Sequence, residues 1–513
     1  MRTARVVVVG AGLGGLVAAL LLGHHGLAVT VVERTSGPGG KLRQVGIGNA
    51  RLDAGPTVFT LRGLFEDILA EAGVSLSDSI KLEPLTTLAR HAWGRDQRLD
   101  LFADIDRTVE AVGTFASPRE AERYRAFCAR ARRSFQALDR PFIRASRPSL
   151  PRLMRTVGLR GATALWRAGP FSTLWKALGE HFHDERLRQL FGRYATYSGA
   201  SPFLATATLM VIAHVEQEGV WVVDGGMHRI AEMIERHAVA AGVLFRYAAH
   251  VEEVVVSGGR PSGVRLASGE ELPADAVVLN TDVAAVATGL LGKSIAAAVP
   301  SQPSSARSLS AVTWAMVAET SGFPLLHHCV FFSRNYQAEF DDIFGRRRLP
   351  AEPTVYVCAQ DRTGLDGQAI AGPERLLCLV NAPPTGDTHP LSPSEVDACE
   401  ERTFQLLRSY GLRIQHRREL TVRTTPAEFA QMFPATGGAL YGQAQHGWMA
   451  SFRRPGTRTR LPGLYLAGGS VHPGPGLPMV ALSGRQAAAA LLSDLASTGR
   501  SSRVAIPGGM SMR

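Results

Sequence analysis

The beginning of the chain alternates short apolar runs with glycine-rich breaks. Residues 5–9 contain four consecutive valines, which is typical of a strand buried on both faces of a parallel sheet. Residues 16–25 are rich in leucine and alanine and predict a helix, and residues 28–32 predict a second buried strand. A strand, a helix and a strand in this order predict an α/β fold with a parallel sheet.

Glycines fill the turn between the first strand and the helix, as Gly10, Gly12, Gly14 and Gly15. Gly10 would permit a tight turn, Gly12 would let the backbone approach a pyrophosphate, and Gly15 would let the helix pack closely on the strand. The helix would direct unpaired N–H groups at the phosphates. Glu33 ends the second strand, where its carboxylate would accept hydrogen bonds from a ribose and repel a 2′-phosphate. These residues predict a dinucleotide site rather than a signal peptide or a membrane helix.

Two later regions also combine glycine turns with buried strands and a helix. Gly225 and Gly226 precede a helix predicted at 230–241. Further strands are predicted at 249–256, 263–266 and 274–280. Near the end of the chain, a strand predicted at 463–466 runs into Gly468 and Gly469, and a helix is predicted from about 480 to 495. A helix N-terminus there would again face an anionic or electron-rich group.

Composition adds little to this picture except at the cysteines. The 513 residues have room for two or three domains, and 45% hydrophobic and 20% charged residues are ordinary for a globular protein. The cysteines are odd in number and far apart, which favours buried thiols in a reducing compartment: Cys128, Cys329, Cys358, Cys378 and Cys399. Adjacent residues on a strand point to opposite faces, so His327, His328 and Cys329 would not converge on an ion. We therefore predict no metal site.

Basic residues are concentrated in one segment. Between Arg119 and Lys176 the 14 Lys and Arg residues exceed the three acidic ones by 11, which equals the formal net charge of the whole chain, +11. Large apolar residues are interleaved with them: Phe135, Phe142, Leu153, Trp166, Phe171 and Trp175. This mixture suits an anionic membrane surface, and a solvated helix face is the alternative. No nucleic-acid-binding motif accompanies the segment, and no run of about 20 apolar residues predicts a membrane span.

The residues after Glu33 resemble a known family. Gly39-Gly40-Lys41 and then Asp53-Ala54-Gly55-Pro56-Thr57 resemble the extended dinucleotide motif of the flavin amine oxidase and phytoene desaturase superfamily. The resemblance implies FAD, with Lys41 offsetting phosphate charge and Val251 contacting the adenine through its backbone. The implied cofactor-binding residues are Gly10, Gly12, Gly14, Gly15, Glu33, Arg34, Gly40, Lys41, Gly55, Pro56, Thr57, Val251, Gly468, Gly469, Pro478 and Met479.

The resemblance also implies how the chain is divided into domains. The expected fold is α/β, with a Rossmann-like FAD-binding domain of the glutathione-reductase and amine-oxidase type. That domain would be discontinuous, built from residues 1–75, 222–290 and 455–497. Residues 76–221 and 291–454 would form a substrate-binding and membrane-associating domain. The tail at 498–513, rich in serine and glycine, is expected to be disordered.

Later motifs narrow the resemblance to carotenoid desaturases. They are His183–Phe191 with Tyr197–Pro202, Gly437–Gly442, and His472-Pro473-Gly474 with Gly476. The segments Phe331–Ser333, Val355–Arg362 and Ala467–His472 are most similar to the 1-hydroxycarotenoid 3,4-desaturases, also called methoxyneurosporene dehydrogenases. At 222–226 the chain departs from phytoene desaturases, which tend to have a proline before the glycine pair.

The implied activity removes two hydrogens from a long acyclic carotenoid, with a hydride passing to the flavin. The implied location is cytoplasmic and peripheral on the inner membrane, and the implied electron acceptor is oxygen or a quinone. His214, Glu216 and His472 are candidate bases by chemistry, and none is assigned. The alternatives are a phytoene desaturase, a carotenoid isomerase that uses reduced FAD, an amine or porphyrinogen oxidase, and a flavin-free escort protein for prenylated partners. Product mass separates desaturation from isomerisation.

Overall fold

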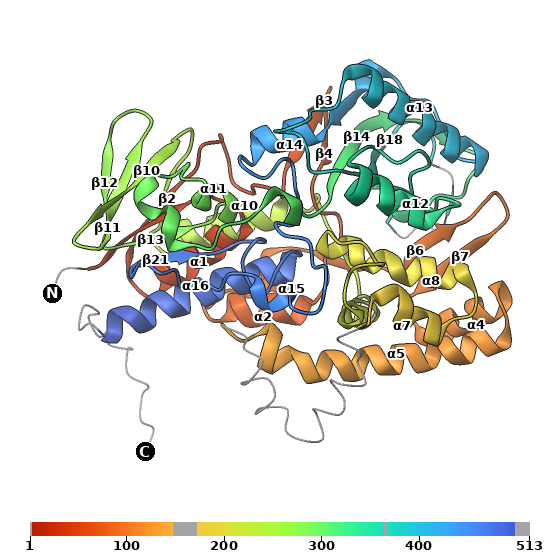
Figure 1. The fold of residues 1–513 in the computed structure, drawn as a ribbon, viewed down its shortest axis with the longest axis horizontal. Helices are drawn as coiled ribbons and strands as arrows, with labels where there is room; N and C mark the ends of the chain where they lie inside the picture. Colours follow the sequence, from red (N-terminus) through yellow and green to blue (C-terminus); the bar gives the residue numbers. More distant parts are fainter. Residues whose placement is uncertain (1–2, 147–171, 364–366, 369, 498–513) are drawn as a thin grey trace.

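The glycine-rich beginning of the chain lies in a five-stranded parallel sheet (Figure 1). The computed structural model describes residues 3–146, 172–363, 367–368 and 370–497. The sheet has the order β21-β13-β1-β2-β9, and neighbouring strands are all parallel. Its strands are β1 (Arg5–Val9), β2 (Ala28–Val32), β9 (Leu244–Arg246), β13 (Ala276–Leu279) and β21 (Leu464–Leu466). Strands from the beginning, the middle and the end of the chain therefore form one layer.

Alternating valines explain why this sheet is buried on both faces. Val6 and Val8 pack against three helices, whereas Val7 and Val9 face a second, smaller sheet. The helices are α1 (Leu13–His24), α10 (Arg229–Ala240) and α16 (Leu477–Ser497). The smaller sheet is antiparallel and consists of β10 (Val251–Ser257), β11 (Arg260–Leu266) and β12 (Glu271–Pro273).

Two of the predicted helices begin about three residues earlier than the sequence pattern indicated. The helix predicted from residue 16 begins at Leu13, so Gly14 and Gly15 lie in its first turn. The helix predicted from about residue 480 begins at Leu477. Glycine has a low helix propensity, and its presence masked the first turn of α1. The strands predicted at 5–9 and 28–32 have the predicted bounds.

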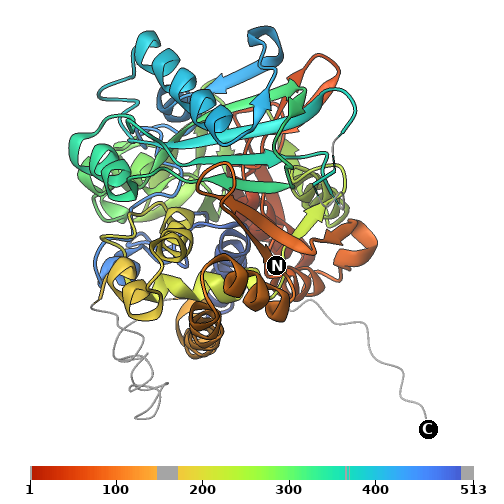
Figure 2. The same cartoon turned by 90° about the vertical axis from the view of Figure 1, so that its right-hand side faces the viewer.

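A seven-stranded sheet forms the second layer of the molecule, in the order β20-β14-β18-β17-β16-β6-β7. Its strands are β6 (Thr87–Ala92), β7 (Arg98–Phe102), β14 (Ser310–Ala318), β16 (His328–Phe331), β17 (Val355–Ala359), β18 (Glu374–Ala382) and β20 (Thr421–Thr424). Helix α13 (Pro393–Ser409) covers its outer face, where Trp314 and Phe331 are buried (Figure 2). The hairpin of β3 (Gln44–Ile47) and β4 (Ala50–Asp53) packs on the other face.

A layer of helices lies below the seven-stranded sheet in Figure 1. Its members are α4 (Ile105–Phe115), α5 (Pro118–Leu138), α7 (Leu174–His181), α8 (Glu185–Gly192) and α9 (Val211–Gln217). Two short helical turns complete it, η2 (Arg193–Ser198) and η3 (Ala207–Met210). Val330 and Phe332 of the sheet join the apolar core of this layer. Helix α12 (Tyr336–Phe340), which Figure 1 draws above β6 and β7, adds Tyr336 and Phe340 to the same apolar core.

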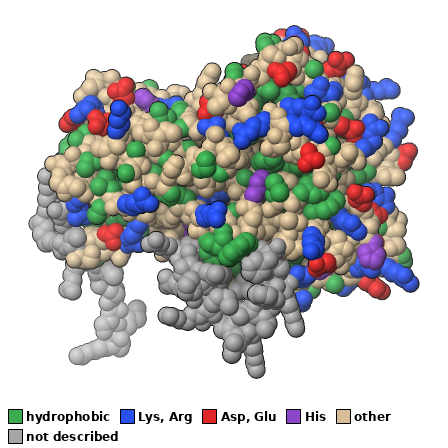
Figure 3. Space-filling view, in the orientation of Figure 1, with side chains coloured by type: hydrophobic (Ala, Val, Ile, Leu, Met, Phe, Trp, Pro, Cys, Tyr) green, Lys and Arg blue, Asp and Glu red, His purple; other side chains and the backbone are tan. Residues whose placement is uncertain are grey.

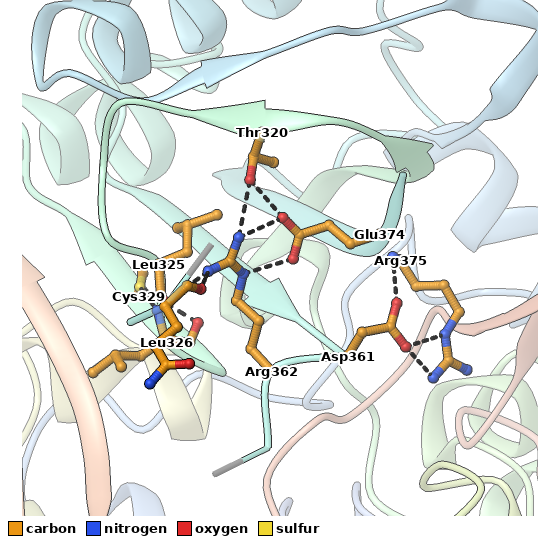
Figure 4. Close-up of polar contacts among 9 residues, drawn as sticks. Thr320, Leu325, Leu326, Cys329, Asp361, Arg362, Glu374 and Arg375 are labelled. Carbon is orange, nitrogen blue, oxygen red and sulfur yellow. Dashed lines mark hydrogen bonds and ion pairs between the residues drawn. The ribbon is translucent and has the colours of Figure 1, made fainter. Parts of the chain in front are cut away.

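One ion pair is buried at the rim of the seven-stranded sheet (Figure 4). Arg362 donates to both carboxylate oxygens of Glu374, with N···O distances of 2.6 and 2.7 Å. The exposed fractions of the two side chains are 4% and 1%. Thr320 contacts both partners, and the Leu325 carbonyl accepts from Arg362. The pair is therefore fully enclosed and hydrogen-bonded.

Where the structure describes them, the aromatic residues interleaved with the basic ones in the basic segment pack against other parts of the protein. Three of the segment's aromatic residues pack on interior partners: Phe135 on His214, Phe142 on Phe452 and His472, and Trp175 on Phe203 and Tyr336. Each of these three rings is half-buried, and the suitability of the segment for a membrane surface stays a prediction. Leu153, Trp166, Phe171 and the tail at 498–513 lie outside the described residues.

No described helix combines the length and the apolar composition that crossing a bilayer requires.

Candidate functional site

One large cavity, of about 1410 Å³, lies where the two sheets and the helical layer meet. At one end it is lined by the glycine loop after β1 and by the residues that follow β2. At the other end it is lined by the inner face of the seven-stranded sheet and by the helical layer. Ligands of open α/β sheets bind at the carboxyl ends of the strands, and this cavity has that position.

The glycine loop is packed so tightly that side chains are excluded from it. A Cβ atom on Gly15 would lie 2.2 Å from the Gly10 carbonyl oxygen, and one on Gly12 would lie 2.6 Å from Oδ1 of Asn280. Gly10 itself has a φ of +100°, which favours glycine. The loop therefore brings bare backbone to the cavity wall at the N-terminus of α1, where anions bind well.

Glu33 is held in place at the end of β2. Its Oε2 accepts from the Ala11 N–H at 2.8 Å, and its Oε1 accepts from the N–H and the hydroxyl of Thr35, each at 2.9 Å. The side chain is almost buried but lines the cavity. A carboxylate fixed at this point suits the hydroxyl groups of a ribose.

Two enclosed cations lie near the Gly468-Gly469 turn. Lys41 lines the cavity, and its Nζ donates to the Leu440 carbonyl at 2.6 Å. Arg454 donates to the carbonyls of Gly469 and Gln443 at 2.7 and 3.0 Å. Burial lowers the pKa of Lys41, and burial lowers the pKa of Arg454 to about 10. Neither forms a direct ion pair with any residue that the structure describes, and the nearby charge of Asp282, which also lines the cavity, opposes the effect of burial by raising the pKa of both.

Fourteen of the sixteen residues predicted for FAD line this single cavity, including Arg34, Thr57, Val251 and Met479. Gly14 and Gly15 do not line it. Instead, Gly14 packs on the backbone of Gly468 and Gly484, and Gly15 packs on Gly10. Both hold α1 close to the loop, which is the role that the spacing predicted for Gly15.

The cavity contains a second group of polar residues, of which the sequence reasoning had singled out only Glu216, as a candidate base. Arg193 and Tyr197 of η2, Glu216 of α9, Tyr336 of α12 and Tyr356 of β17 all line it. They come from four elements that are far apart in the sequence, so no local spacing could have grouped them. Tyr197 and Tyr356 lie in motifs that carried the family resemblance, but the resemblance gave no role to either residue.

The three candidate bases differ in position. Glu216 lines the cavity, and burial raises its pKa while hydrogen bonds from Tyr194 and Tyr197 lower it. His214 lies behind the wall, with Nε2 at 3.2 Å from Glu218. His472 also lies behind the wall, with Nε2 at 3.0 Å from the Phe142 carbonyl, and burial lowers its pKa to about 4. Only Glu216 can meet a ligand in the cavity.

Near the cavity, His327, His328 and Cys358 bring their donor atoms within 4.8 Å of one another. The assumption that His327 and His328 point to opposite faces is wrong, because β16 begins at His328 and the two rings are 4.6 Å apart. Cys329 does point away and accepts from the Leu326 N–H. Burial raises the pKa of Cys358 and lowers that of His327 to about 4, so the cluster is uncharged. The absence of a metal stays a prediction.

Comparison with known proteins gives consistent matches over the whole length of the chain. Residues 13–492 match the model of the family described as flavin containing amine oxidoreductase. The chain is 55% identical to hydroxyneurosporene desaturase of Rubrivivax gelatinosus, with 100% of this chain and 98% of that protein covered. It is 46% identical to hydroxyneurosporene desaturase of Cereibacter sphaeroides, with coverage of 97% and 99%. An oxidoreductase from Methanosarcina mazei of known structure has a similar fold, with a TM-score of 0.59, 16% identity and coverage of 94% and 99%.

Proposed function

The chain belongs to the family of flavin containing amine oxidoreductases, and from this premise we propose that it desaturates an acyclic, 1-hydroxylated carotenoid at the 3,4 position. The matches confirm the predicted family, the α/β fold and the use of FAD. The protein is an FAD-dependent oxidoreductase of carotenoid biosynthesis. One observation carries the proposal: a single cavity joins the nucleotide loop to a long wall of apolar side chains.

Different residues of the cavity would bind different parts of FAD. Glu33 would hold a ribose, and the N-terminus of α1 together with Lys41 would hold the diphosphate. Gly468, Gly469, Pro478 and Met479 would lie against the flavin ring. When bound, the flavin supplies a hydride acceptor. The fit is good because the loop brings bare backbone to the N-terminus of α1 and because Lys41 lines the cavity without a direct ion pair to a described residue.

The apolar wall suits a polyene. It is formed by Phe135, Leu138, Phe142 and Ile143 at the end of α5, and by Leu209, Val211, Ile212 and Val215 around α9. These side chains exclude water from the bond that loses hydrogen, and they would align a long, rigid chain along the cavity.

Desaturation is tested by the product of the full-length protein. In cells that make hydroxyneurosporene, we expect a product lighter by two hydrogens and a red shift of the visible bands, since each new double bond extends the conjugation. A product of unchanged mass would indicate isomerisation. Peroxide release with amines and no change of a carotenoid would indicate an amine oxidase, and a purified chain that stays colourless with added FAD would indicate an escort protein.

We propose that the protein associates peripherally with the cytoplasmic face of the inner membrane, where its substrate is dissolved. Arg119, Arg132, Arg133 and Arg140 are exposed and form no ion pair with any described residue. Arg140 adjoins Leu138 and Phe142 of the cavity wall. In Figure 3, apolar side chains also lie along the lower edge of the molecule, and basic ones are spread over this face.

Flotation with vesicles measures this association. We expect the protein to bind vesicles that contain anionic phospholipid, and to bind them more weakly at high salt. The triple variant Arg132→Glu, Arg133→Glu, Arg140→Glu should clearly lose binding, because each basic residue near the surface contributes about 1 kcal/mol to the free energy of membrane binding. Equal binding of the triple variant and the unmodified protein would contradict the proposal.

The electron acceptor is proposed to be oxygen or a quinone. Reoxidation of the reduced protein by a soluble quinone without oxygen, compared with reoxidation in air, distinguishes the two.

A further inference from the structure

Five side chains form a polar cluster in the cavity wall, beside other polar lining residues such as Tyr441 and Asn381: Arg193, Tyr197, Glu216, Tyr336 and Tyr356. A polyene offers nothing for them to bind. Polar groups that face an apolar ligand without a hydrogen-bond partner are costly, since each loses its contacts with water. Tyr197, Glu216 and Tyr356 have hydrogen-bond partners in the protein. The groups left for a polar ligand are therefore the Tyr336 hydroxyl and the remaining donors of Arg193.

Arg193 has donors available for a ligand. Its Nη1 donates to the Tyr197 hydroxyl at 2.9 Å, and the guanidinium lies over the rings of Tyr197 and Tyr356, at 5.2 and 5.4 Å from their centroids. It forms no ion pair with any acidic residue in the part of the chain that the structure describes. A guanidinium has five N–H donors, and only one is used here in a hydrogen bond to a side chain.

Tyr336 presents a phenol without a partner. The residue is 6% exposed, its hydroxyl is buried, and that hydroxyl has no hydrogen-bond partner among the described residues. Burial raises the pKa of Tyr336 well above its usual value, so the phenol stays protonated and can both donate and accept.

Tyr356 links this cluster to the cofactor end of the cavity. Its hydroxyl lies 2.7 Å from Oγ1 of Thr57 and 2.8 Å from Nδ1 of His328. Thr57 is one of the residues predicted to contact FAD and lines the same cavity. The polar cluster thus adjoins the expected place of the reacting bond rather than the distant end of an apolar tunnel.

We propose that Arg193 and Tyr336, with Tyr197 orienting the guanidinium, bind the terminal hydroxyl group of the carotenoid and select hydroxylated over unhydroxylated substrates. This inference rests on the proposed desaturation. The geometry of the substrate agrees with it, because carbon 3 of a 1-hydroxylated chain is only two carbons from the one that bears the hydroxyl. A hydroxyl site must therefore lie close to the flavin, and this one does through Tyr356 and Thr57.

Two matched substrates test the proposal, hydroxyneurosporene and neurosporene, with the full-length FAD-loaded protein. We expect Tyr336→Phe to lower kcat/KM for the hydroxylated substrate about 10-fold, and Arg193→Met to lower it by about 10- to 100-fold. Neither variant should lower kcat/KM for neurosporene. The reduced protein cannot accept a hydride, so it allows dissociation constants to be measured without turnover. In both variants the dissociation constant for hydroxyneurosporene should rise, and that for neurosporene should not.

Tyr124→Phe is the matched control, since Tyr124 is a buried tyrosine outside the cavity wall whose hydroxyl donates to Gln217. This variant should leave the ratio of kcat/KM for hydroxyneurosporene to kcat/KM for neurosporene unchanged. If Arg193→Met fails to fold, Tyr336→Phe still tests the proposal, because the Tyr336 hydroxyl has no hydrogen-bond partner among the described residues. Equal losses for both substrates, or a lack of preference in the unmodified protein, would overturn the hydroxyl site and leave the desaturase intact. An unmodified protein that converts no carotenoid would overturn both.

Discussion

Replacing Gly15 with alanine is expected to leave the purified protein largely without FAD. The new Cβ would lie 2.2 Å from the Gly10 carbonyl oxygen and 3.0 Å from Cβ of Asn280. Because Gly10 is held by a hydrogen bond from its N–H to Val32, the strain falls on α1, which must move away from the loop. Overpacking of this kind costs about 1–3 kcal/mol. If that cost falls on the bound state, FAD affinity decreases by about 10- to 100-fold.

The ratio of flavin to protein absorbance and a titration of the apoprotein with FAD measure this effect. Gly63→Ala is the control, because Gly63 lies in α2 (Arg62–Ala70) and a Cβ there would meet nothing within 4 Å. The control should retain FAD. A Gly15→Ala protein with unchanged FAD affinity would show that the close contact of α1 with the loop does not matter for cofactor binding.

Removing one partner of the Arg362–Glu374 ion pair is expected to be strongly destabilising. Arg362→Met would leave the Glu374 carboxylate, whose side chain is 1% exposed, without its two charged hydrogen bonds. Leaving a buried charge unpaired costs about 3–5 kcal/mol of unfolding free energy. The double variant Arg362→Met, Glu374→Leu should recover much of this loss, since it removes both charges together.

Urea unfolding followed by tryptophan fluorescence measures these differences. The neighbouring pair Arg375–Asp361, also drawn in Figure 4, offers a control in the same place. Its side chains are 36% and 31% exposed, so Arg375→Met should cost no more than about 1 kcal/mol. If Arg362→Met and Arg375→Met lower the free energy of unfolding equally, burial of the ion pair does not determine the cost of breaking it.

The nucleotide half of the site could be predicted from the sequence because its determinants are local. The strands at 5–9 and 28–32, the glycines between them and Glu33 follow one another within about thirty residues, and each has a fixed backbone role. The substrate half could not be predicted in this way. Arg193, Glu216, Tyr336 and Tyr356 are brought together only by packing of the helical layer against the sheet.

The aromatic residues of the basic segment illustrate the same limit. Phe135 and Phe142 alternate with arginines, and composition alone suggested a surface for both kinds of residue. In the structure the arginines Arg132, Arg133 and Arg140 are exposed, whereas the two rings line the cavity. Which side of a helix faces the core depends on its neighbours, and those come from distant parts of the chain.

The position of β21 in the parallel sheet has a consequence for synthesis on the ribosome. Its residues, Leu464–Leu466, pair with β13 and are made after nine-tenths of the chain. Until then the edge of β13, with Val277 and Leu279, stays uncovered, and α16 cannot pack on α1. An apolar strand edge of this kind promotes pairing with other chains. The nascent protein therefore cannot complete its cofactor site before residues 464–466 have been made, and fragments that stop before residue 464 would be prone to aggregate.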